Sequence, residues 1–173
     1  MTDDRSGGTL VIGLGSPLMG DDGLGLVALE RLRAEGVRDG VTLADGGTWG
    51  LNLLPMIESA DRVLFIDAVH GGMKPGQVAI LESDVIPRFL QTKLSPHQID
   101  LREVLALAEL RGTLPAEMVV CGMEPESVEM RTGLSPVVER NLGELVRAVR
   151  AQLAEWGHHG DGASPIGVAR CMN

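Results

Sequence analysis

The chain has 173 residues, of which 44% are hydrophobic, which suits one domain with a substantial buried core. Its formal net charge of −9 excludes the common modes of binding to nucleic acid or to an anionic membrane, because both need a basic surface. No apolar run reaches the roughly 18 residues of a membrane span, and we expect no signal peptide in the acidic, polar N-terminus. Two cysteines without a shared motif predict a reduced, cytoplasmic protein.

Strands and helices are expected to alternate along the first part of the chain. Apolar runs and amphipathic spacing predict a strand, a helix, a strand, a helix and a strand, over residues 9–14, 23–34, 41–44, 51–59 and 62–69. The last of these, RVLFIDAV, is the clearest buried strand because it is rich in β-branched and apolar residues. The short strand at 41–44 is expected to end in the loop Asp45-Gly46-Gly47-Thr48.

The alternation continues to residue 156. We expect a strand, a helix, a strand and a long helix over residues 77–82, 95–111, 117–123 and 135–156, with Ser135 and Pro136 as cap and first residue of the last helix. Residues 158–173 are expected to form a flexible tail, in which His158 and His159 lack the apolar anchors of a metal site.

This order predicts a single α/β domain over residues 1–157. It is expected to have three layers, with helices on both faces of a mostly parallel, twisted sheet. Ligands of such folds bind beyond the carboxyl ends of the strands, and candidate residues are therefore sought there.

A glycine-rich loop, GLGSPLMGDDGLG, follows the first predicted strand, where α/β proteins place phosphate-binding loops. Gly15 and Gly20 have the spacing of a P-loop, but Asp21 and Asp22 stand where Lys and Ser or Thr should follow. The dinucleotide fingerprint also fails, because Leu18 occupies its third glycine position. A small nucleotide-binding enzyme is therefore only a rival hypothesis.

Acids at the end of a strand suit a cation. Asp67 ends the clearest buried strand, and His97 is expected in the first turn of a helix opened by Ser95 and Pro96. The positive end of the helix dipole disfavours imidazolium, which leaves the neutral imidazole that a metal requires. Asp22, Asp67 and His97 could therefore converge on one metal ion, since carboxylate and imidazole are suitable ligands.

Each of these residues also has an ordinary explanation. Asp21 or Asp22 could cap the following helix, Asp67 could accept hydrogen bonds from nearby backbone amides, and His97 could be structural. The two acids after the strand at 117–123, Glu124 and Glu126, are expected to face solvent.

No signature of a conventional peptidase is present. The sequence has neither the GxSxG elbow nor the HExxH helix, and Cys121 is expected in the core because its strand is apolar. A serine, cysteine or conventional zinc peptidase is therefore not predicted.

The chain nevertheless resembles the [NiFe]-hydrogenase maturation endopeptidases. The resemblance rests on DDG, IDA and SPH, in this order and spacing, within VIGLGSPLMGDDGLG, LADGGTWGLNLLPMIESADRVLFIDAV and KLSPHQIDLREVLALAELRGTLP. It continues through VVCGMEPESVEMRTGLSPVVERNL and covers residues 9–156.

The resemblance implies an activity and a substrate. Such enzymes remove a C-terminal extension from the nickel-loaded precursor of a hydrogenase large subunit, so the nickel is supplied by the precursor. The family's metal-contacting residues fall on Asp22, Asp67 and His97, which are also the candidate catalytic residues. A non-catalytic chaperone that recognises the nickel-loaded precursor is the alternative.

Candidate substrate contacts lie in two loops. They are Ser16, where relatives usually have Asn, together with Asp21, Asp45, Gly46, Gly47 and Thr48. Glycines in the second loop would allow a substrate peptide to approach the backbone closely.

Overall fold

The sheet of this protein is mostly parallel, as predicted. The computed structural model describes residues 8–47, 50–82, 86 and 96–158, with the backbone alone for 96–100. Within them, five strands form one sheet in the order β2-β1-β3-β5-β4. The strands are β1 (Thr9–Leu14), β2 (Val41–Gly47), β3 (Arg62–Ala68), β4 (Val78–Glu82) and β5 (Glu117–Met123). Only β4, at one edge, runs antiparallel to its neighbour.

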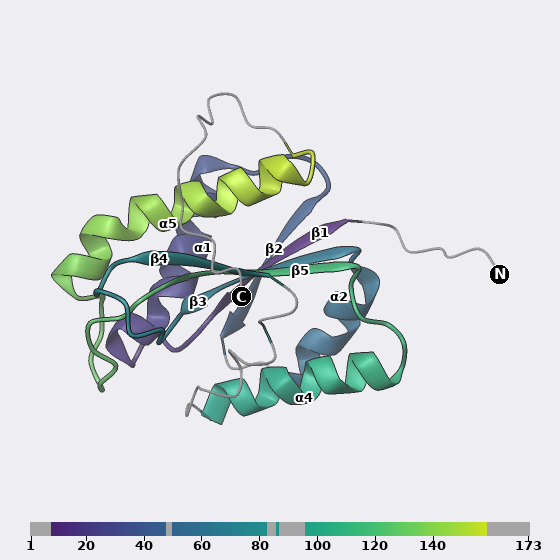
Figure 1. Ribbon diagram of the computed structural model, residues 1–173, viewed down its shortest axis with the longest axis horizontal. Coiled ribbons are helices and arrows are strands. Elements are labelled where there is room, and N and C mark those ends of the chain that lie inside the picture. Colours follow the sequence, from purple (N-terminus) through teal and green to yellow (C-terminus); the bar gives the residue numbers. More distant parts are fainter. Residues whose placement is uncertain (1–7, 48–49, 83–85, 87–95, 159–173) are drawn as a thin grey trace.

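Helices cover both faces of the twisted sheet and complete the three layers (Figure 1). One face carries α1 (Leu24–Glu35) and α5 (Pro136–Glu155), and the other carries α2 (Leu54–Ser59) and α4 (Pro96–Leu110). Two short 3₁₀ helices, η1 (Gly20–Gly23) and η2 (Gly50–Leu53), precede α1 and α2. None of the described helices has the length and apolar character needed to cross a membrane.

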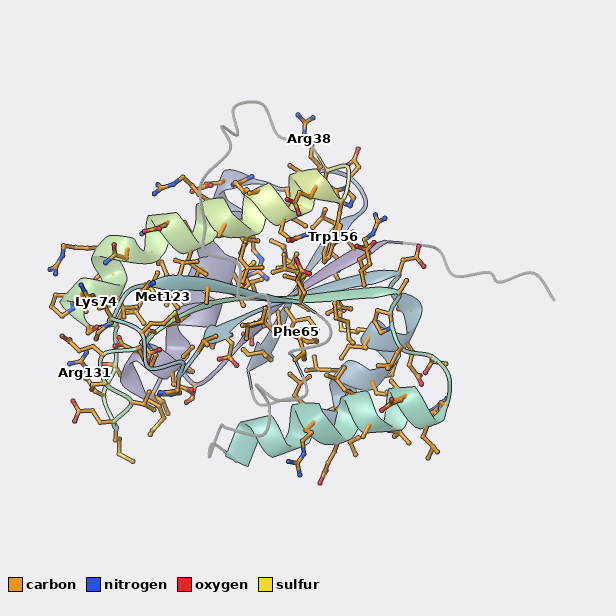
Figure 2. The ribbon with its side chains drawn as sticks, viewed as in Figure 1. Arg38, Phe65, Lys74, Met123, Arg131 and Trp156 are labelled. Atoms are coloured by element: carbon orange, nitrogen blue, oxygen red, sulfur yellow. The ribbon has the colours of Figure 1, made fainter. Side chains whose placement is uncertain are left out.

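Each face of the sheet has its own aliphatic core. Leu64 and Ile66 of β3 pack in the cluster beneath α1 and α5, whereas Val63 and Phe65 pack in the cluster beneath α2 and α4. The Phe65 side chain can be followed on that second face in Figure 2. Because alternate residues of a strand point to opposite faces, a strand buried on both faces must be apolar throughout. This requirement explains the continuous hydrophobic run that identified β3 in the sequence.

Most predicted element boundaries hold closely, but β2 is longer than the strand expected over residues 41–44, and one helix is divided. Ser135 is the N-cap of α5 as expected, and its Oγ accepts a hydrogen bond from the Val138 amide. The single helix expected over residues 51–59 is instead η2 followed by α2. Pro55 lies at the start of α2 and explains the division, because proline has no N–H to donate and its ring obstructs the preceding turn.

Candidate active site

The carboxyl ends of β1 and β3 lie at the end of the molecule where α1 and α5 begin (Figure 1). The glycine-rich loop that leaves β1 here folds back so that residue 22 touches residue 15. Gly15 has a φ of 109°, and a Cβ there would lie 1.8 Å from the Asp22 carbonyl oxygen. Only glycine can adopt this conformation at this separation.

The carboxylate of Asp22 binds a backbone amide of the glycine-rich loop. Its Oδ2 accepts a hydrogen bond of 2.8 Å from the backbone N–H of Ser16, and the residue is only 5% exposed. The protein's own carboxylate thus binds an amide that a phosphate-binding loop offers to its ligand. This contact explains how a glycine-rich loop can end in acids, and it disfavours the nucleotide-binding hypothesis.

Neither acid caps the helix, contrary to the ordinary explanation. The N-cap of α1 is Gly23, and no side chain accepts a hydrogen bond there. The first cap position of η1 is Met19, again without a side-chain hydrogen bond. The two acids must therefore be explained by other contacts.

Asp21 is fully buried and is held by four hydrogen bonds. Its Oδ1 accepts from the Ser135 amide at 2.6 Å, and its Oδ2 accepts from the Ser135 hydroxyl at 2.8 Å. The amides of Glu126 and Ser127 also donate to Oδ2, at 2.9 and 3.2 Å. Burial raises the pKa of Asp21, but the hydrogen bonds from Ser135, Ser127 and Glu126 outweigh it and lower the pKa below its ordinary value.

Asp21 therefore joins three segments far apart in the sequence: the first loop, the loop after β5 and the start of α5. Since both of its oxygens are occupied inside the protein, we assign it a supporting role in place of the substrate contact expected from the sequence.

Asp67 lies at the carboxyl end of β3, on the strand next to β1. It is fully buried, and its Oδ1 accepts a hydrogen bond of 2.7 Å from the Ala68 amide. This local hydrogen bond is the ordinary explanation offered for Asp67, and it involves one of the two carboxylate oxygens. A buried carboxylate at a strand end is nevertheless suited to a cation, because burial makes an uncompensated charge costly.

Close packing at Gly25 brings the loop of Asp22 to the end of β3. A Cβ on Gly25 would lie 2.2 Å from the carbonyl oxygen of Ile66 and 2.5 Å from that of Leu14. The first turn of α1 therefore rests on the backbone of both strands just before they end, and any larger residue would push it away. Asp22 lies three residues before Gly25, and Asp67 directly follows Ile66. Both acids consequently belong to the same end of the sheet, where β1 and β3 terminate.

His97 is the second residue of α4, in the first turn as predicted. The helix begins at the same end of the molecule as the carboxyl ends of β1 and β3 (Figure 1). Its side chain, together with Ser95 of the expected cap, lies outside the described part of the structure. Among the described side chains, which do not include that of His97, no three His, Cys, Asp or Glu residues gather in a metal-binding group.

The segment Asp45-Gly46-Gly47 belongs to β2 and is not the loop that the sequence predicted. Gly13 pairs with Asp45 and Leu14 with Gly47, so the register shifts by one residue at Gly46. A Cβ on Gly46 would lie 2.3 Å from Ile12 Cγ2, which explains the glycine. Asp45 is exposed on β2, the outer strand of the sheet, and its Oδ1 accepts a hydrogen bond of 3.0 Å from the Gly47 amide. Thr48 lies outside the described residues.

Ser16 is almost buried, at 9% exposed, between the end of β1 and η1. Its Oγ accepts a weak hydrogen bond of 3.4 Å from the Leu18 amide, and its carbonyl accepts from Met19 at 3.2 Å. Together with the hydrogen bond from its amide to Asp22, these contacts give Ser16 a role in shaping the loop.

Glu124 was expected to face solvent, and this expectation is wrong. It is 8% exposed, and its Oε2 accepts hydrogen bonds from the amides of Gly71 and Met73, at 2.7 and 3.2 Å. The carboxylate thus fixes the loop that follows β3 and Asp67. Sequence reasoning missed it, although the adjacent Gly71 and Gly72 indicated a tight turn with amides to satisfy. Glu126, in contrast, is exposed as predicted.

Cys121 is fully buried in β5, where desolvation, with a further contribution from the charge of Glu155, raises the pKa of its thiol to about 12. A thiol that stays protonated is a poor nucleophile. The prediction that Cys121 is a core residue and not a catalytic one is therefore confirmed by its environment.

The fold and the site together define the class of the protein: a three-layer α/β enzyme with buried acids near the carboxyl ends of β1 and β3, whose glycine-rich loop binds its own carboxylate and whose Cys121, the cysteine within the described residues, is buried in the core. The chain belongs to the hydrogenase maturation protease family, whose model matches residues 27–152. It is thus a peptidase, and the non-catalytic alternative is not favoured.

Individual relatives agree with this assignment. The chain is 37% identical over 159 residues to the hydrogenase expression/formation protein HupD of Bradyrhizobium diazoefficiens, covering 90% of this chain and 83% of the relative. It is 34% identical over 150 residues to the hydrogenase 2 maturation protease of Escherichia coli, covering 86% and 92%. The solved structure of the E. coli hydrogenase maturating endopeptidase HybD matches with a TM-score of 0.82 and 33% identity, over 87% of this chain and 94% of that one.

Proposed function

We propose that this protease removes a C-terminal extension from the nickel-loaded precursor of a [NiFe]-hydrogenase large subunit, in the cytoplasm. The observation that carries the proposal is the pair of low-exposure acids in a maturation protease: Asp67 at the end of β3, and Asp22 in η1, which follows the neighbouring strand β1. The acidic surface and the buried, reduced Cys121 suit a protein partner in a reducing compartment.

In this proposal the metal belongs to the substrate. Asp22, Asp67 and His97 contact the nickel of the precursor, as two oxygen ligands and one imidazole. The hydrogen bonds that Asp22 makes to described residues end on Oδ2, which leaves Oδ1 for the metal. Three ligands leave coordination positions for the groups with which the precursor already holds its nickel. Cleavage then depends on nickel, because an unloaded precursor lacks the atom that anchors it.

The scissile segment of the precursor lies beside the exposed edge of β2. The edge strand carries Asp45, Gly46 and Gly47, and an edge strand can pair with an extended peptide. We assign these residues, together with Ser16 and Thr48, to substrate contact. Asp45 faces the peptide, and Gly47, which is only partly buried, allows its backbone to come close.

Cleavage of a purified precursor with and without nickel tests the proposal. The product is weighed by mass spectrometry, and we expect a shortened large subunit with the loaded precursor alone. An intact precursor in a stable complex with the protein would indicate a chaperone, and equal cleavage of both precursors would refute the role of nickel. A thermal shift with a dinucleotide but not with the loaded precursor would support the nucleotide-binding alternative.

A further inference from the structure

Two loops at the rim of the site are joined to each other. The loop before η1 and the loop after β5 form a parallel bridge between Met19 and Arg131. The Gly20 amide donates to the Arg131 carbonyl at 2.8 Å, and the Arg131 amide donates to the Leu18 carbonyl at 3.0 Å. This register sets Leu18 beside Met130, one residue before each bridge partner.

Both of these apolar side chains face solvent. Leu18 is 62% exposed and Met130 is 89% exposed, and Val128, on the same loop as Met130, is 40% exposed. These three are half of the six large hydrophobic residues that are exposed in the described part of the chain. Contiguous exposed apolar side chains, unlike single ones, can contribute to a site of interaction. We call Leu18 and Met130 the apolar tip.

The apolar tip stands on a rigid base. Asp21 lies behind it and accepts hydrogen bonds from the amides of Glu126 and Ser127, while its own amide donates to the Ser127 carbonyl at 3.2 Å. Gly20 packs against the same loop, since a Cβ there would lie 3.2 Å from the Ser127 carbonyl oxygen. A surface whose backbone is already ordered loses little conformational entropy when a partner binds.

The apolar tip is continuous with the site. Leu18 lies two residues after Ser16, whose amide is bound to the carboxylate of Asp22. Leu18 therefore belongs to the loop whose backbone binds the carboxylate of Asp22, one of the residues that hold the precursor in the proposed function.

We propose that the apolar tip is the docking surface for an apolar segment of the hydrogenase precursor next to its cleavage site. This inference rests on the proposed function and adds a residue pair that selects the substrate. Methionine suits such a surface because its flexible, polarisable side chain adapts to different apolar partners.

A second copy of this chain is the less suitable occupant. Two such side chains contribute on the order of 200 Å² of apolar surface, whereas a stable complex buries about 800 Å² on each partner. The tip alone is therefore too small for a dimer, but a protease substrate supplies the remaining contacts in the active site.

Replacement of the apolar tip by serine tests the inference. We expect Leu18→Ser and Met130→Ser each to raise the KM for the nickel-loaded precursor by about tenfold, with kcat unchanged, because an apolar contact formed on docking is lost. Leu110→Ser is the matched control, since Leu110 is 84% exposed at the far end of α4. The precursor's affinity is also compared between Asp67→Asn alone and Asp67→Asn combined with each variant; cleavage does not interfere there, and the loss of one metal ligand is common to all these proteins.

The outcomes separate this inference from the proposed function. If the wild-type protein cleaves the precursor and the tip variants keep its KM, the inference fails while the function stands. If nothing is cleaved but the tip variants lose affinity for the precursor, the function fails while the docking surface stands. The inference would be overturned if Leu110→Ser raised the KM as much as the tip variants do, or if the tip variants lowered kcat alone. It would also be overturned if the wild-type protein were a dimer and combining Leu18→Ser with Met130→Ser abolished it.

Discussion

Charged groups at the two ends of the sheet are held in different ways. At the amino end, Arg62 forms an ion pair of 2.8 Å with Glu117, and the indole N–H of Trp156 donates to the same carboxylate at 2.9 Å. The guanidinium carbon of Arg62 also lies 6.0 Å from the centre of the Trp156 ring, which Figure 2 shows at this end of the molecule. At the carboxyl end, Asp21, Asp22 and Glu124 are held by backbone amides and a hydroxyl.

The difference indicates that the contacts at the amino end stabilise the fold, whereas the acids at the carboxyl end can also serve a ligand. An arginine neutralises the acid at the amino end, so little negative charge is left for a ligand. Amides fix an acid in place without adding a positive unit charge, and the carboxyl end therefore keeps an anionic character suited to a cation. The following substitutions test this comparison.

Loss of one candidate ligand should have the largest effect. We expect Asp67→Asn and His97→Ala to reduce cleavage of the nickel-loaded precursor by on the order of a hundredfold or more, while the fold is kept. Asparagine retains an oxygen for the hydrogen bond from Ala68, removes the charge and replaces the other oxygen by an amide group. Cleavage is followed by mass spectrometry and folding by circular dichroism. Asp61→Asn, just before the amino end of β3, is the control and should cleave normally; wild-type rates in the other two variants would refute the site.

Neutralising Asp21 should destabilise the protein. An asparagine at this position would keep one oxygen and replace the other by an amide group. Some of the four donors that now share the carboxylate would then face another donor, so D21N should lose about 2–3 kcal/mol of unfolding free energy. Urea denaturation at pH 7 measures the loss. Asp45→Asn is the control, because Asp45 is exposed and accepts one local hydrogen bond, and it should change stability by less than about 0.5 kcal/mol. Equal effects of the two substitutions would contradict the role of Asp21.

The same carboxylate predicts a dependence on pH. The pKa of Asp21 is lower in the folded protein than the value of about 3.9 for an unfolded chain, so its contribution is complete above that value. As pH falls below that value, the unfolded chain takes up the proton before the folded protein does. The stabilisation from the ionised Asp21 is therefore lost progressively until the pH passes the pKa of Asp21 in the folded protein. The difference in unfolding free energy between wild type and D21N should therefore stay constant from pH 7 to 5 and shrink below about pH 4. A difference that is flat down to the lowest measurable pH would exclude an ionised Asp21 as its cause.

Local patterns predicted the fold, whereas contacts between distant segments decided the details of the site. Alternating apolar runs located each strand of the described residues, and Ser135-Pro136 located the start of α5, because these signals lie within a few neighbouring residues. The partners of Asp21 lie 105 to 114 positions away, and those of Glu124 lie 51 and 53 positions away. No periodicity reports such pairs, so the sequence did not predict the partners of either acid, and it wrongly placed Glu124 in solvent.

The extent of β2 was missed for a related reason. Asp45, Gly46 and Gly47 have low intrinsic preference for strands, and the sequence predicted a loop. Pairing with Gly13 and Leu14 of β1 extends the strand through them, with a shift in register at Gly46. The neighbouring strand thus overrides local preference and makes Asp45 part of β2.

The smallest effect is expected at the amino end of the sheet. Arg62 and Glu117 have side chains that are 38% and 50% exposed, so water screens their attraction, and Arg62→Ala should cost about 0.5–1 kcal/mol of unfolding free energy. Because the pair lies at the end opposite to Asp22 and Asp67, cleavage of the precursor should remain at the wild-type rate. Urea denaturation at low and high salt measures this loss of unfolding free energy, which should be smaller at high salt. Arg150→Ala, which breaks an exposed ion pair with Glu35, provides a similar loss elsewhere for comparison. A clear fall in cleavage with Arg62→Ala but not with Arg150→Ala would show that the two ends of the sheet are coupled. It would contradict the conclusion that contacts at the amino end serve stability alone.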